Sequence, residues 1–307
     1  MRRIYIFLIL IFSATVMHGQ VPKSFFGDAE LTVESVDEIN TISSEIAPCF
    51  VDNMLYYSGI PERYFKSAKR RKKNTAFYQA LSVGLNANGN ILSVPQQASG
   101  FGGEMHEGPV DYCDKTGELF VTLSRSADEF DGEQTNREGL NKLRLVIKKQ
   151  VDGKWMTTEE LPFNDPNFNF AHPAISTTGD TLIFSSDLDS LNYGNTDLFM
   201  SVRNNGQWSE PQNLGEYINS PGNEVFPTLL PGGFFTFATN GRTIQKGGLD
   251  IYYTSFPEMD EVEIFGEGIN TEFDDFGLIL HRNEKVGYFT SNRNKKNSDD
   301  IFILKIE

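Results

Sequence analysis

One segment of the sequence recurs at a spacing of about 52 residues, and this repeat constrains the fold more than any other feature. The segment LIFSSDLDSLNYGNTDLFMS (182–201) has echoes at 235–255 and 287–305. Its phenylalanines are 53 and 52 residues apart (Phe184, Phe237 and Phe289). Its aspartates are 53 and 50 residues apart (Asp197, Asp250 and Asp300). Two markers that move together at such a period indicate a repeated supersecondary unit.

Further markers extend the repeat towards the N-terminus. An Ile-Asn-Thr/Ser triplet precedes an acidic residue by a constant step in three copies (Glu45, Glu224 and Asp275). A proline follows at the same place in four copies (Pro48, Pro109, Pro173 and Pro227). The segments LYYSG (55–59) and LFVTLS (119–124) match LIFSS, but their spacings of 64 and 63 residues indicate insertions in the first two copies. We count five copies.

Each copy contains four short apolar runs separated by Gly, Asp and Asn turns, which is the organisation of a propeller blade. The sequence therefore predicts an all-β fold, a single β-propeller over residues 20–307 with five blades of four antiparallel strands. Six blades remain an alternative. The segment 301–307 reads as a third strand with no fourth after it, and 25–38 resembles a fourth strand. We expect the N-terminal segment to close the ring, which removes an open sheet edge.

The N-terminus has the pattern of a secretory signal peptide. Arg2 and Arg3 precede an apolar run over 4–16, which is too short to span a bilayer, and we place cleavage after Gly19. The predicted product has no transmembrane segment and is exported. The formal net charge of the whole chain is −15, and loss of the two arginines makes the product more acidic. A strongly acidic chain repels nucleic acid, because phosphate binding needs neutralisation by Lys and Arg, so nucleic acid is excluded as a partner.

The two cysteines, Cys49 and Cys113, fall on equivalent strands of neighbouring repeats but are about three residues apart in register. That offset is roughly 10 Å along a strand, which exceeds the Cα separation of a disulfide. We therefore expect free, buried thiols.

The repeat resembles the TolB-like β-propeller repeat family, which is related to the WD repeats. The likeness is strong over 171–307 and weaker over 40–165, where NTAFYQ (74–79) and LNKLRLV (140–146) lack the aspartate. It is carried by NEVFP (223–227), FSSD (184–187), GNTDLF (194–199) and GGLDIYY (247–253). The resemblance implies an interaction platform without intrinsic catalysis, in the periplasm or at the outer membrane or cell surface of a Gram-negative-type envelope. Similar repeats precede a peptidoglycan-binding domain in OmpA-family envelope proteins of Bacteroidetes, but no such domain follows here, so peptidoglycan attachment is not carried over.

Several polar residues lie near the start of the predicted innermost strands, which line the channel of a propeller. They form a candidate binding site at one channel mouth (Glu45, His106, Glu107, His172, Glu224 and Asp275). The favoured alternative is structural: each acid binds backbone N–H groups of a neighbouring blade, because repetition at one position indicates a role in the fold. The repeated Asp197, Asp250 and Asp300 are interpreted as turn residues, since Asp bonds its own backbone in turns.

No cofactor or metal is predicted. The histidines after the leader are far apart in sequence, whereas a zinc site usually has two closely spaced ligands (His106, His172 and His281). The segment DLDSLN (187–192) loosely resembles a calcium loop but lacks the glycine and closing glutamate of an EF-hand, so calcium is an alternative to an Asx-rich turn.

The first insertion contains KSAKRRKKN (66–74), and the second, SADEFDGEQTNREG (126–139), is acidic. The basic loop is a candidate docking site for an acidic partner (Lys69, Arg70, Arg71, Lys72 and Lys73). A solvated loop is the alternative. The sequence thus predicts a non-catalytic scaffold that binds an envelope protein or a surface glycan, with no catalytic residues assigned and no oligomeric state indicated. The runner-up is a carbohydrate-active propeller, a glycoside hydrolase or lectin-like protein, that uses channel-mouth carboxylates.

Overall fold

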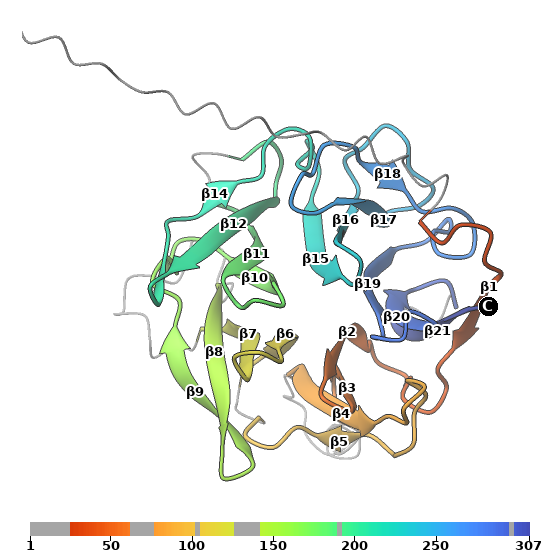
Figure 1. The fold of residues 1–307 in the computed structure, drawn as a ribbon, viewed down its shortest axis with the longest axis horizontal. Helices are drawn as coiled ribbons and strands as arrows, with labels where there is room; N and C mark the ends of the chain where they lie inside the picture. Colours follow the sequence, from red (N-terminus) through yellow and green to blue (C-terminus); the bar gives the residue numbers. More distant parts are fainter. Residues whose placement is uncertain (1–24, 62–76, 102–104, 126–141, 189–191, 295–297) are drawn as a thin grey trace, which may run out of the picture.

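The computed structural model describes residues 25–61, 77–101, 105–125, 142–188, 192–294 and 298–307. Within these residues, 21 strands form five antiparallel sheets around a central axis, and no helix is present (Figure 1). The predicted five-bladed β-propeller is therefore confirmed, and the six-bladed alternative is wrong. Nothing in the described part of the chain is both helical and apolar over the length that a membrane span requires. The predicted signal peptide, residues 1–19, lies outside the described residues.

The strands of each blade are given from the channel outwards. Blade 1 contains β2 (Ile46–Val51), β3 (Met54–Gly59), β4 (Gln79–Gly84) and β5 (Gln96–Gln97). Blade 2 contains β6 (Glu107–Cys113), β7 (Glu118–Ser124), β8 (Leu143–Val151) and β9 (Lys154–Glu160). Blade 3 contains β10 (Phe170–Ile175), β11 (Thr181–Ser186) and β12 (Asp197–Asn204), which pairs with both β13 (Gln207–Trp208) and β14 (Gln212–Asn213).

Blade 4 contains β15 (Glu224–Leu230), β16 (Phe234–Thr239), β17 (Asp250–Ser255) and β18 (Glu263–Ile264). Blade 5 contains β19 (Asp275–Leu280), β20 (Val286–Ser291), β21 (Asp300–Ile306) and β1 (Leu31–Ser35). The fourth strand of the last blade thus comes from the N-terminal segment, as the sequence predicts. Glu30 and Glu307 extend the pairing of β1 with β21 by two reciprocal backbone hydrogen bonds of 3.1 and 3.0 Å.

A bulge interrupts the pairing of every innermost strand with its second strand at an equivalent place. Two residues of the innermost strand are left unpaired there before the regular pairing resumes. The first bulged residue has a positive φ in all five blades (Ala47, Gly108, His172, Phe226 and Gly277). The repeated proline follows it in four blades. A bulge releases a backbone N–H from the strand ladder, so proline, which lacks an N–H, is tolerated there. The repeated proline therefore marks the bulge of the innermost strand.

The core is divided into five apolar clusters, and each cluster joins two neighbouring blades. The repeated phenylalanines of the second strands are fully buried in these interfaces (Phe184, Phe237 and Phe289). Phe184, for example, packs on Phe199 of its own blade and in the cluster that contains Phe120 of blade 2. Sheets stacked face to face around a ring bury both faces of each blade, which explains why the strands read as near-continuous apolar runs.

Cys49 and Cys113 lie on the innermost strands of blades 1 and 2, and both are buried and free. The expected free thiols are confirmed.

Candidate functional site

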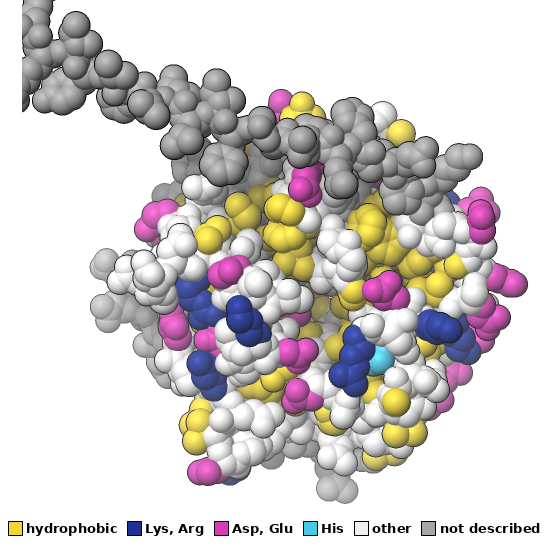
Figure 2. All heavy atoms as spheres, viewed as in Figure 1, with side chains coloured by type: hydrophobic (Ala, Val, Ile, Leu, Met, Phe, Trp, Pro, Cys, Tyr) yellow, Lys and Arg dark blue, Asp and Glu magenta, His cyan; other side chains and the backbone are white. Residues whose placement is uncertain are grey.

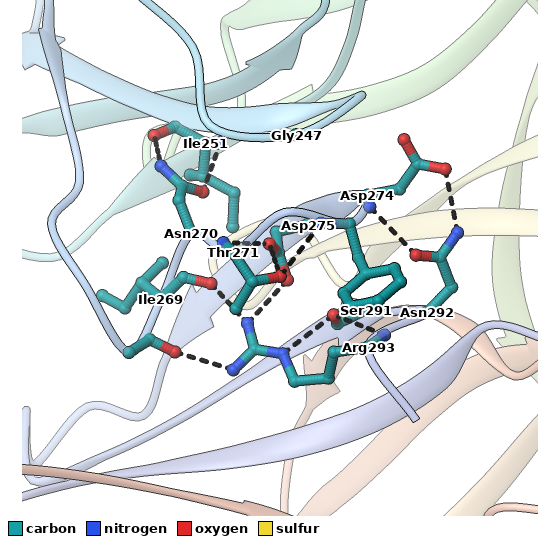
Figure 3. Close-up of polar contacts among 12 residues, drawn as sticks. Gly247, Ile251, Ile269, Asn270, Thr271, Asp274, Asp275, Ser291, Asn292 and Arg293 are labelled. Carbon is teal, nitrogen blue, oxygen red and sulfur yellow. Dashed lines mark hydrogen bonds and ion pairs between the residues drawn. The ribbon is translucent and has the colours of Figure 1, made fainter. Parts of the chain in front are cut away.

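The three repeated acids lie at the start of innermost strands, and each binds the link that leads into its strand. We call the segment between the outer strand of one blade and the innermost strand of the next a link. The side chains of these acids are fully buried, with 0% exposure (Glu45, Glu224 and Asp275). Each carboxylate accepts hydrogen bonds from the backbone N–H and the hydroxyl of the residue four positions earlier (Thr41, Ser220 and Thr271). Figure 3 shows this arrangement at Asp275, where Thr271 donates from N at 2.6 Å and from Oγ1 at 2.8 Å.

Burial perturbs two of these acids. Loss of hydration raises the pKa of Glu45 to about 7, although hydrogen bonds from Thr41 oppose the rise. Burial also raises the pKa of Glu224, against hydrogen bonds from Ser220 and Thr239. Each acid lies beside the aspartate that opens the third strand of the preceding blade, Asp300 for Glu45 and Asp197 for Glu224, and the neighbouring carboxylate adds to the rise. Ligand binding by these acids stays a prediction.

The asparagine of each Ile-Asn-Thr/Ser triplet pairs with the backbone of the preceding blade. Asn270 accepts from Ile251 N at 2.8 Å and donates to Ile251 O at 2.9 Å (Figure 3). The other two triplets repeat the pattern, Asn219 with Leu198 and Asn40 with Ile301. A side-chain amide that matches a backbone donor and acceptor continues the sheet hydrogen bonding across the link. These triplets therefore join neighbouring blades.

Arginines from two second-to-third-strand loops clamp the links, and the sequence analysis missed them. Arg293 donates to the carbonyl of Ile269 and to Asp275 (Figure 3). It also donates to the carbonyl of Gly268 and lies over the ring of Phe289 at 5.0 Å. Arg242 donates to the carbonyls of Tyr217 and Ile218 and lies over Phe237 at 5.5 Å. The signal was present, since NGR (240–242) and SNR (291–293) occupy the same place after the second strand.

The repeated aspartates contact the turns before their strands. Asp197 accepts from Tyr193 N at 2.7 Å and Gly194 N at 3.1 Å. Asp250 accepts from Lys246 N and Gly247 N in the same manner, and Asp300 accepts from the side chain of Asn294.

His106 and Glu107 lie at the start of β6. His106 Nδ1 accepts from Tyr78 N at 3.1 Å, and burial lowers the pKa of this imidazole. Glu107 is 7% exposed. Burial lowers the pKa of Lys148, and the negative charge of Glu107 opposes this shift. Both predicted site residues thus contact neighbouring strands.

The channel contains a cavity of about 30 Å³, lined by residues of all five innermost strands. Such a volume has room for about two water molecules. Figure 2 shows one face of the molecule, hollowed near its centre with hydrophobic side chains at the bottom. Of the six predicted channel-mouth residues, His172 is the one that lines the cavity.

Three rings stack across the channel beside this cavity, one from each of blades 3, 4 and 5. The ring centroids of His172 and Phe226 are 4.0 Å apart, and those of Phe226 and Phe276 are 4.4 Å apart. Burial lowers the pKa of His172 to about 3, so the imidazole is neutral, and its Nδ1 accepts from Phe226 N at 3.5 Å. We call this group the channel stack.

Asp111 lines the same cavity and was missed by the sequence analysis. It accepts from Ile175 N at 2.7 Å and Tyr112 N at 2.9 Å, and the thiol of Cys49 lies 3.6 Å from its Oδ1. Burial raises the pKa of Asp111 to about 6. Its carboxylate therefore joins blades 2 and 3.

The remaining predicted sites lie partly or wholly outside the described residues. The docking residues 69–73 lie outside the described residues, in the connection from β3 to β4. Residues 189–191 of the calcium-like segment also lie outside them, and its Asp187 binds Lys142 at 3.0 Å and the side chain of Asn169 at 2.7 Å. Across the described ranges, no group of three or more His, Cys, Asp or Glu is placed to hold a metal ion.

Comparison with known proteins supports the fold. No protein-family model and no curated protein sequence matches the chain. Among solved structures, an α-L-arabinofuranosidase from Lactobacillus brevis aligns with a TM-score of 0.53 and 9% identity, over 89% of this chain and 94% of that one. A thermostable family-43 glycoside hydrolase aligns with a TM-score of 0.51 and 10% identity, over 89% and 96%.

TolB propeller proteins are also among the structural neighbours. TolB from Acinetobacter baumannii aligns with a TM-score of 0.44 and 12% identity, over 75% of this chain and 48% of that one. At such identities the likeness extends to the fold, and function has to be argued from the residues.

Proposed function

We propose that the protein is an exported, non-catalytic β-propeller that binds another protein or a glycan in the cell envelope. The observation that carries this proposal is the small size of the channel cavity. The channel stack lies beside the channel cavity, which has a volume of about 30 Å³. Glycoside hydrolysis requires two carboxyl groups that face a sugar. The repeated acids are instead buried against the links, so the described residues favour a scaffold over a hydrolase.

The surface beside the links supports binding there. In antiparallel blades, the links and the loops between second and third strands lie on one face of the ring. Four large apolar side chains are 51–86% exposed on these segments (Ile42, Tyr193, Tyr217 and Ile244). A contiguous patch of exposed apolar groups would form an interaction surface on this face. Both insertions are also connections between second and third strands, so their ends reach the same face.

The envelope location rests on the signal-like N-terminus and on the resemblance to TolB-like repeats. The acidic charge fits an exported protein that does not bind nucleic acid.

A pull-down from envelope extract tests the proposal. The chain from Gln20 is compared with a variant in which Lys69, Arg70, Arg71, Lys72 and Lys73 are changed to Ser. We expect the unmodified chain to retain a specific protein or glycan at moderate salt, and the variant to lose at least about tenfold of it, since each exposed charge contributes a few tenths of a kcal/mol.

A matched variant removes exposed lysines of the opposite face instead (Lys115, Lys154 and Lys285). It should retain the ligand as well as the unmodified chain does. An equal loss of bound ligand in both variants would show that the interaction is a non-specific attraction between charges. Turnover of arabinofuranosides or other glycosides by the purified chain would overturn the non-catalytic assignment.

A further inference from the structure

A cavity of about 270 Å³ lies at the outer rim of blade 4, between the N-terminal segment and the strands β17 and β18. Four aromatic side chains contribute to its wall (Phe25, Phe26, Tyr253 and Phe265). They contact one another, with ring centroids 5.2 Å apart for Phe25 and Phe265, and 4.6 Å apart for Tyr253 and Phe265. This wall is assembled from segments more than two hundred residues apart in sequence.

Two carboxylates line the same cavity, Glu263 and Glu267. Glu263 Oε2 accepts a hydrogen bond from the hydroxyl of Tyr253 at 2.7 Å, which orients the carboxylate beside the rings. Within the part of the chain that the structure describes, neither glutamate forms an ion pair. Both residues are exposed, so the acidic side of the cavity opens to solvent.

Aromatic faces and carboxylates together attract organic cations. The negative face of an aromatic ring binds an ammonium or guanidinium group, and a neighbouring carboxylate supplies the opposite charge. The cavity is large enough to admit a lysine or arginine side chain, and the acidic chain attracts basic partners over a longer range.

We propose that this aromatic pocket binds a basic side chain, lysine or arginine, of a partner polypeptide. The inference rests on the proposed scaffold function and gives it a second contact, of opposite charge to the basic loop. The open rim and the exposed glutamates favour a side chain that enters from outside over a small molecule enclosed within the fold.

The probe is the peptide acetyl-Gly-Gly-Lys-Gly-Gly-amide, with versions that carry trimethyllysine or norleucine at the centre. Binding to the ¹⁵N-labelled chain is followed by shifts of the backbone amides of Gly266 and Glu267. We expect the lysine and trimethyllysine peptides to shift these amides, and norleucine, which keeps the alkyl chain without the charge, to bind at least about tenfold more weakly.

The variant Glu263→Gln with Glu267→Gln should weaken the lysine peptide by about fivefold or more. Glutamine keeps an acceptor for the hydroxyl of Tyr253, so folding is retained. The matched control is Glu261→Gln, which removes an exposed charge two residues from Glu263 and does not line the cavity. It should leave binding unchanged.

Three results would overturn the inference: no saturable shift with the lysine peptide, equal binding of the norleucine peptide, or an equal loss in Glu261→Gln. Its failure is separate from that of the proposed function. If the Glu263→Gln, Glu267→Gln variant still binds the envelope ligand, the proposed scaffold function stands and the pocket has no part in it. If the lysine peptide binds but no envelope ligand is found, the inferred pocket stands and the proposed scaffold function is contradicted.

Discussion

At the scale of single residues, one asparagine in each of three links continues the hydrogen bonding of one blade into the next. Asn270 pairs with both backbone groups of Ile251 and also donates to Phe265 O at 3.1 Å. We expect Asn270→Ala to lower the free energy of unfolding by about 2 kcal/mol, because buried backbone groups lose their partners. Denaturant unfolding measures the change. Asn88→Ala, at an exposed turn, is the control, and an equal effect of both substitutions would contradict the assigned role.

Glu45 makes the stability dependent on pH. Its folded pKa of about 7 lies above the ordinary value of 4.5, so the unfolded chain ionises first as the pH rises. Its contribution is therefore fully present below pH 4.5 and is lost as the pH rises through about 7. His172 acts in the opposite sense, since its pKa of about 3 makes the folded state lose stability as the pH falls below 6.5.

The difference between the unmodified chain and Glu45→Gln isolates the first effect. We expect the unmodified chain to gain about 2 kcal/mol relative to the variant between pH 8 and pH 5. Thermal unfolding across this range measures it, with Glu216→Gln at an exposed position as the control. A difference that does not change with pH would show that Glu45 titrates normally.

The acids and their link partners could have been paired from the sequence, whereas the channel stack could not. Thr41 and Glu45 are four residues apart within one repeated motif, and that constant step was visible. His172, Phe226 and Phe276 come from three different blades, and no local pattern distinguishes them from other strand residues. Their contact depends on the radius of the ring and on the bulge in each innermost strand.

At the scale of elements, β1 covers the edge of β21. We expect a chain that begins at Val36 to expose the edge of β21 and to self-associate, because an unpaired edge strand is a template for further pairing. Size-exclusion chromatography with light scattering measures this. A chain that begins at Phe25 keeps β1 and should stay in the state of the chain from Gln20. A monodisperse, equally stable product from the shorter chain would show that β1 is dispensable.

The closure of the last blade was predictable because the segment 25–38 resembles a fourth strand of the repeat. The aromatic pocket was not, since nothing in Phe25-Phe26 indicates that these rings reach Tyr253 and Phe265 on blade 4. The repeat specifies which strands neighbour one another, but an appended segment packs wherever its apolar groups fit.

At the scale of the whole molecule, each blade is held by two neighbours, so one blade is not expected to open alone. Cys49 and Cys113 are buried in different interfaces, and both should react with a thiol reagent at the single rate of global unfolding. Mass spectrometry of the labelled chain resolves the two sites, and guanidinium chloride confirms that both react once exposed. Labelling of one cysteine ahead of the other would reveal local opening of its blade.

The pairing of the two chain ends also has a consequence for how the protein is made. Lys305 and Glu34 are separated by 271 positions, yet they meet across the final strand pair, with Nζ 2.6 Å from Oε2. The ring therefore cannot close until residues 300–306 of β21 have been synthesised, and contacts of such long range form slowly. A nascent chain of this kind keeps its ring open during synthesis, and under the export that we propose it would reach the export channel in that open state. Under the same proposal, β1 and β21 would pair only after export.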